Sequence, residues 1–97
     1  MEREKLWTKK EKKELNDIYF KILRITREYY EIQSRNTGHL WIIKKQYTNG
    51  YFVTLYHKHS QKILYYHKQC NLSTVGQGIK IIKKHDRYIQ NRGLGQQ

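Results

Sequence analysis

The first third of the chain carries an apolar pattern with helical spacing. Apolar residues recur at intervals of three and four, which places them on one side of a helix: Leu15, Ile18, Ile22, Ile25, Tyr29 and Ile32. Just before them, Thr8 and Glu11 have the spacing of a capping box, which satisfies free amides in a first helical turn. The pattern predicts a helix over residues 8–34. Flanking apolar residues favour packing on a sheet, and a coiled-coil homodimer through this helix is the alternative.

After residue 38 the pattern changes to the alternation of β-strands. Residues that favour strands dominate, and the pair Asn49-Gly50 predicts a two-residue hairpin turn, because a type I′ turn needs positive φ at both central positions. A second tight turn is predicted at Ser60-Gln61. Strands are predicted over residues 39–48, 51–58 and 62–68. The prediction is a three-stranded antiparallel meander within residues 39–69.

The predicted turn also sets the strand register and thereby sorts the side chains onto two faces. A two-residue loop at Asn49-Gly50 places Tyr47 opposite Phe52 and Trp41 opposite Lys58. One face is then mostly aliphatic and suits a core. The other face combines rings and cations: Trp41, Tyr47, Phe52, Tyr56, Tyr65, Lys45, Lys58 and His67. Such a face can bind single-stranded nucleic acid, because rings stack on bases and cations meet phosphates; the alternative is a face covered by a helix or a partner.

A second helix is predicted over residues 73–91, followed by a disordered tail over 92–97. Apolar residues line one side of this helix: Leu72, Val75, Ile79, Ile82 and Ile89. Cations cluster on another side: Lys80, Lys83, Lys84 and Arg87. Ser73 or Thr74 can cap the helix, and Gly76 and Gly78 leave the backbone near its start bare. Free amides and the helix dipole at that start favour a phosphate oxygen.

Together these segments predict a single α+β domain over residues 1–97, in the order helix, three strands, helix. This order resembles the double-stranded-RNA-binding-domain fold group. Gly76-Gln77-Gly78 and Lys83-Lys84 resemble the glycine and lysine pairs with which that group holds RNA phosphates. The segment Arg35-Asn36-Thr37-Gly38-His39 is similar to the Gly-Ser-His motif of HicA-type toxin ribonucleases, which share the fold order. That resemblance implies a catalytic role for His39.

Charge supports a polyanionic partner. The 97 residues carry a net charge of +12, but residues 1–34 hold nine Lys/Arg against seven Asp/Glu. Residues 35–97 hold eleven Lys/Arg and one acid, Asp86. A basic segment with so few carboxylates attracts nucleic acid, with an acidic protein or membrane surface as the alternative. The absence of Pro and Ala and the many Lys, Ile, Tyr and Asn residues suggest an AT-rich coding sequence, as in bacterial phages or mobile elements.

Catalysis and metal binding have weaker support. Metal-dependent nucleases need clustered carboxylates, and after residue 34 only Asp86 is available. The five histidines could serve metal-independent acid–base chemistry: His39, His57, His59, His67 and His85. A zinc site from His57, His59, His67 and Cys70 lacks a recognised ligand spacing, and the predicted register puts His67 on the face opposite His57. We therefore predict no metal and no cofactor.

The lone cysteine, Cys70, and the lack of a long apolar run predict a cytoplasmic protein without a membrane span. The sequence thus favours a non-enzymatic protein that binds DNA or RNA. Its predicted contact residues are Lys80, Lys83, Lys84, Arg87, Lys45, Lys58, Trp41, Tyr56 and Tyr65. One alternative is a HicA-like ribonuclease that uses His39. Another is a phage-type factor that binds a host protein through the aromatic sheet face or the first helix.

Overall fold

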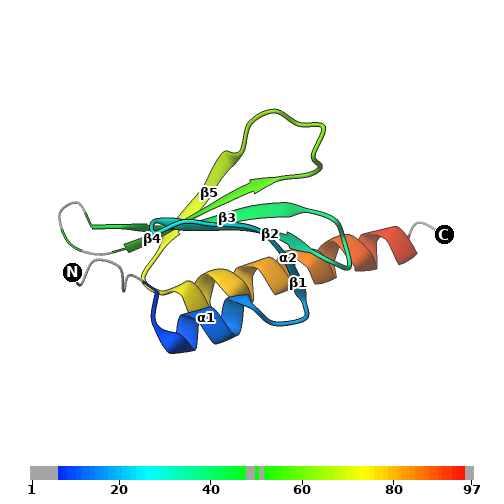
Figure 1. Cartoon of the computed structure of the whole chain (residues 1–97). Coiled ribbons are helices and arrows are strands. Elements are labelled where there is room, and N and C mark those ends of the chain that lie inside the picture. The colour runs from blue at the N-terminus through cyan, green and yellow to red at the C-terminus, as the bar shows by residue number, and fades with distance from the viewer. Residues whose placement is uncertain (1–6, 48–49, 51, 96–97) are drawn as a thin grey trace.

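The computed structural model describes residues 7–47, 50 and 52–95, and it shows two helices on one face of an antiparallel sheet (Figure 1). The helices are α1 (Lys9–Leu15) and α2 (Val75–Gly95). The strands are β1 (Phe20–Ile25), β2 (Tyr29–Ser34), β3 (Leu40–Gln46), β4 (Phe52–Lys58) and β5 (His67–Leu72). The five strands lie side by side in chain order, as an antiparallel meander.

The long helix predicted over residues 8–34 is wrong. Only α1 is helical in this segment, and it starts at the predicted capping box: Thr8 Oγ1 accepts from Glu11 N at 3.1 Å, and Glu11 Oε1 accepts from Thr8 N at 2.9 Å. Residues 20–25 and 29–34 form β1 and β2 instead. This segment is rich in β-branched and aromatic residues, which lose side-chain freedom in a helix and pack well on a pleated sheet. The coiled-coil homodimer therefore has no helix to form it.

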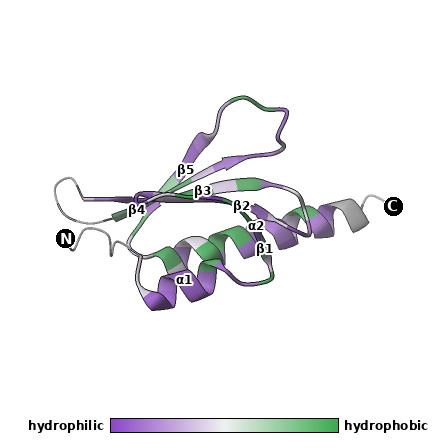
Figure 2. Cartoon of the chain, viewed as in Figure 1, coloured by the Kyte–Doolittle hydropathy of each residue, from purple (hydrophilic) through white to green (hydrophobic). Residues whose placement is uncertain are grey.

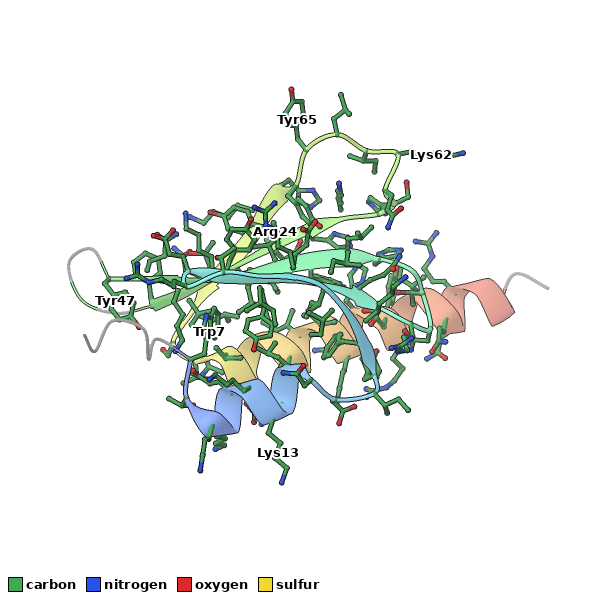
Figure 3. All side chains as sticks on the ribbon, in the orientation of Figure 1. Trp7, Lys13, Arg24, Tyr47, Lys62 and Tyr65 are labelled. Carbon is green, nitrogen blue, oxygen red and sulfur yellow. The ribbon has the colours of Figure 1, made fainter. Side chains whose placement is uncertain are left out.

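The three-stranded meander is also wrong, because the sheet has five strands. The segment predicted as the third strand, residues 62–68, is mostly a loop, and β5 begins at His67. Tyr65 and Lys62 project from this loop away from the sheet (Figure 3). The tight turn predicted at residues 60–61 is replaced by this longer connection. The order of elements therefore differs from that of the double-stranded-RNA-binding-domain fold group.

The register of β3 and β4 differs from the prediction by one residue. Gln46 lies opposite Phe52 and Trp41 lies opposite His57. Gly50 has the positive φ expected in the turn, 109°, while Asn49 lies outside the described residues. A slip of one residue exchanges the faces of one strand relative to its neighbour. The face that contains Trp41 therefore continues in β4 with His57 and not with Tyr56.

The core lies between the sheet and the two helices. Its buried apolar residues are Trp7, Leu15, Phe20, Tyr30, Ile32, Trp41, Ile43, Val53, Leu55, Val75, Ile79 and Ile82. Trp7 lies between the layers in Figure 3, where its Nε1 donates to the carbonyl oxygen of Thr26 at 2.9 Å and its ring meets the ring of Tyr30 edge-on. Trp41 is fully buried, and its Nε1 donates to Ser34 Oγ at 3.1 Å.

Helix α2 confirms the predicted second helix and is longer than expected. It runs to Gly95, into the segment predicted to be a disordered tail. In Figure 2 its first turns are largely hydrophobic, and hydrophilic residues dominate farther along. The far end of α2 extends past the sheet (Figure 1). Within the described residues, neither helix combines the length and apolar character that a membrane crossing needs.

Candidate functional site

The exposed side of α2 presents cations without a carboxylate. Lys80, Lys84, Arg87 and Arg92 are exposed, and Lys83 is half-buried. Helical spacing places Lys80, Lys83, Lys84 and Arg87 along one side, and we call these four residues the α2 cation row. The one acid of α2, Asp86, is 0 % exposed. The row therefore has no neighbouring carboxylate of its own helix at the surface.

The carboxylate of Asp86 points into the protein, where two hydroxyl groups donate hydrogen bonds to it. Its Oδ2 accepts from the hydroxyl of Tyr19 at 2.7 Å, and its Oδ1 accepts from Thr37 Oγ1 at 2.9 Å. Burial and the hydrogen bond to Asp86 raise the pKa of Tyr19 to about 12. These bonds hold the second half of α2 against the connections before β1 and before β3.

The sequence contains a signal for the buried position of Asp86, although no role was predicted for this residue. Asp86 follows Ile82 by four positions and precedes Ile89 by three. It therefore occupies the apolar side of the helix, where a carboxylate needs hydrogen-bond donors from elsewhere in the fold. Sequence alone does not show that Tyr19 and Thr37 supply them.

Two residues of the cation row border a shallow polar pocket. Lys83 and Arg87 line it together with Tyr19, Asn36 and Gln90. The ammonium group of Lys83 lies 5.0 Å from the centre of the Tyr19 ring, and Asn36 Nδ2 donates to the Tyr19 hydroxyl at 3.3 Å. A pocket bordered by two cations and two amides suits an anion such as a phosphate group.

The start of α2 does not present the phosphate site that the glycines suggested. Thr74 Oγ1 accepts from Gln77 N at 3.2 Å, so the cap occupies a first-turn amide. Two carboxylates of α1, those of Glu11 and Glu14, line the same pocket as Gly76. Gly78 is buried, and a methyl group there would lie 3.3 Å from Leu72 Cδ1. The glycines thus serve close packing beside acidic side chains, which disfavour an anion.

The residues of the predicted stacking face do not lie together on one exposed surface. Trp41 is fully buried, and Lys45 is 5 % exposed and ion-paired with Glu11, so both lie on the helix-covered side. Tyr56 is half-buried on the opposite side of the sheet, and Tyr65 is exposed in the loop between β4 and β5. Lys58 donates to the carbonyl oxygen of Ile63 at 3.0 Å. These residues do not form one platform of rings and cations.

Instead, the fold gathers the histidines. His39 precedes β3, His57 lies near the end of β4, and His85 lies on α2; one ligand nitrogen from each lies within 4.8 Å of the other two. We call these three residues the histidine cluster. His39 Nδ1 and His57 Nε2 are 2.9 Å apart and form a hydrogen bond. Which of the two rings donates depends on their tautomers. The ring of His59 lies 5.2 Å from that of His39, and the ring of His67 lies 5.3 Å from that of His57.

The environment of the cluster favours uncharged imidazoles. Burial, followed by the neighbouring histidines, lowers the pKa of His57 to about 3. Burial likewise lowers the pKa of His39 below its usual value of 6.5. The ring of Trp41 covers part of the cluster, with its centre 4.2 Å from that of His57. The two buried histidines are therefore neutral at pH 7.

The predicted register concealed this cluster. It placed His57 and His67 on opposite faces, whereas the structure pairs them directly across β4 and β5. The sequence signal for the cluster was that His39, His57 and His67 all lie at strand ends. In an antiparallel meander the end of one strand lies beside the start of the next, so these three positions meet at the same end of the sheet. His85, from a helix distant in sequence, had no such signal.

No known protein family, curated protein or solved structure matches this chain. Functional conclusions therefore rest on the chemistry of the α2 cation row and the histidine cluster.

Proposed function

We propose that this protein binds nucleic acid, DNA or RNA, through phosphate contacts made by the α2 cation row. The observation that supports this proposal is the orientation of Asp86, which is fully buried while Lys80, Lys84 and Arg87 are exposed around it. A row of cations without neighbouring carboxylates produces a positive electrostatic field at the surface. Such a field attracts a polyanion and releases its condensed counterions on contact.

The polar pocket beside the row provides a place for one phosphate group. Arg87 can donate two parallel hydrogen bonds to phosphate oxygens, and Lys83 adds a point charge. The amides of Asn36 and Gln90 are further donors at the rim. These contacts would position the backbone of a nucleic acid without reading its sequence.

The proposal is for binding and not for catalysis. His39, the residue that a HicA-like ribonuclease would use, is 8 % exposed, and its Nδ1 faces His57 at 2.9 Å. No observation in the described residues favours attack by this side chain on RNA. The phage or mobile-element origin and the cytoplasmic location predicted from the sequence belong to the same proposal.

A pair of charge-matched variants tests the proposal. In the first, Lys84→Gln and Arg87→Gln remove two exposed cations of the row. In the second, Lys9→Gln and Lys13→Gln remove two exposed cations of α1, where Lys13 points away from the sheet (Figure 3). Both variants lower the net charge equally. We expect the first to weaken binding to a fluorescent oligonucleotide by about tenfold and the second by about twofold or less.

Fluorescence anisotropy at fixed salt measures these affinities on single-stranded and duplex oligonucleotides of mixed sequence. Equal losses in the two variants would show attraction by net charge alone and would contradict a site on α2. Absence of binding by the unmodified protein at low salt, with binding to an acidic polypeptide, would replace nucleic acid by an acidic protein as the partner.

A further inference from the structure

The histidine cluster has the composition of a transition-metal site. Imidazole nitrogen is a preferred ligand of Zn²⁺, and three histidines occur together in zinc sites that keep a fourth position open. Here His39, His57 and His85 come from three different elements, and one nitrogen from each lies within 4.8 Å of the others. The fold therefore brings together ligands that are far apart in the sequence.

The spacing of the nitrogens is close to that of a tetrahedral site. Zn–N bonds of about 2.0–2.1 Å place two ligand nitrogens about 3.3 Å apart. His39 Nδ1 and His57 Nε2 are 2.9 Å apart, and the third nitrogen lies within 4.8 Å. Small rotations of the rings would bring all three nitrogens to one metal ion. His85 is best able to make such a rotation, because it is half-buried on α2.

A second observation concerns the hydrogen bonds of the cluster. The Nδ1 atom of His85 is buried and has no hydrogen-bond partner within the part of the chain that the structure describes. Asp86 Oδ1 lies 3.9 Å from this atom, too far for a hydrogen bond. A buried polar ring without a full set of partners is costly unless another interaction compensates. Coordination of a metal ion by Nδ1 would supply that interaction.

We infer that His39, His57 and His85 form a site for Zn²⁺, with the fourth coordination position left to water or to a donor from a bound partner. This inference does not depend on nucleic-acid binding. The ring of Trp41, which packs on the rings of His57 and His85, would cover one side of the ion.

The test uses the 97-residue chain without a histidine tag, first treated with EDTA and then freed of the chelator. Titration calorimetry with Zn²⁺ should show one ion bound per chain, and Co²⁺ should give the visible absorption of a tetrahedral complex. Addition of Zn²⁺ should also raise the thermal unfolding midpoint in a concentration-dependent manner, because the ion binds only the folded arrangement.

Two single substitutions provide the comparison. His85→Gln removes a half-buried ligand and should weaken Zn²⁺ binding by about 100-fold or more. His67→Gln removes an exposed histidine that contacts the ring of His57 but is not one of the three ligands, and it should leave binding within about threefold. Circular dichroism of both variants checks that they are folded before titration.

Loss of binding in His85→Gln together with retention in His67→Gln would support the site. The inference would be overturned if the unmodified protein bound no Zn²⁺ at millimolar concentrations. It would also be overturned if folded His85→Gln bound Zn²⁺ as tightly as the unmodified protein, since the ion would then lie elsewhere.

Discussion

Replacement of Trp41 by alanine is expected to lower the free energy of unfolding by about 3–5 kcal/mol. Trp41 is 0 % exposed, and its removal leaves a large cavity under the centre of the sheet. The substitution also removes the donor to Ser34 Oγ and the ring that covers His57 and His85. Urea unfolding followed by circular dichroism measures this loss directly.

Tyr65→Ala is the matched control, because the sequence assigned Trp41 and Tyr65 the same stacking role. Tyr65 is 81 % exposed, so its replacement should change stability by less than about 0.5 kcal/mol. Trp41→Ala with nearly unchanged stability would contradict the register of β3 and β4 described above. Tyr65→Ala with a large loss would contradict the loop between β4 and β5.

Acidification from pH 7 to pH 5 is expected to destabilise the metal-free protein by about 2 kcal/mol through His57 alone. An unfolded chain binds a proton at this histidine near its ordinary pKa of 6.5, whereas the folded protein does not until about pH 3. Below pH 6.5 the unfolded state therefore holds more protons, and the free energy of unfolding falls with decreasing pH. His39, whose pKa is also lowered, adds a loss of the same sign.

The interval from pH 7 to pH 5 spans the ordinary pKa of histidine and lies above the ordinary pKa values of aspartate and glutamate. The titratable groups beside His57 are His39 and His85 of the cluster together with His59 and His67, and Asp86 lies beside His85. Urea unfolding at half-unit pH steps in the presence of EDTA gives the dependence. Constant stability over this interval would show that the buried histidines are solvated or charged in the folded protein.

Local signals in the sequence were enough to locate α2 and the start of α1. The cap at Thr8 and Glu11 depends on side chains three residues apart, and the apolar side of α2 is set by its own periodicity. The end of α1 was not predictable in the same way. Spacings of three and four over Ile18 to Ile32 fit a helix, but the same segment also contains inward positions two apart, such as Tyr30 and Ile32 in β2.

The positions of the histidine cluster and of the partners of Asp86 depend on strand register and on contacts between elements that are far apart in the sequence. A shift of one residue between β3 and β4 moved His57 to the face of Trp41 and removed the predicted stacking platform. Hairpin loop length sets this register, and the assumption of a two-residue loop was the source of the error. His85 and Asp86 meet their partners only through the packing of α2 on the sheet, which no local pattern encodes.

The most direct test of nucleic-acid binding through α2 is the salt dependence of the affinity. With four phosphate contacts, a plot of log K against log salt concentration should have a slope of about −3 to −4 for duplex DNA. Lys84→Gln with Arg87→Gln should reduce the magnitude of that slope by about 2, and Lys9→Gln with Lys13→Gln should leave it unchanged. A slope near zero, or a slope that the α2 substitutions do not change, would contradict the proposed interface.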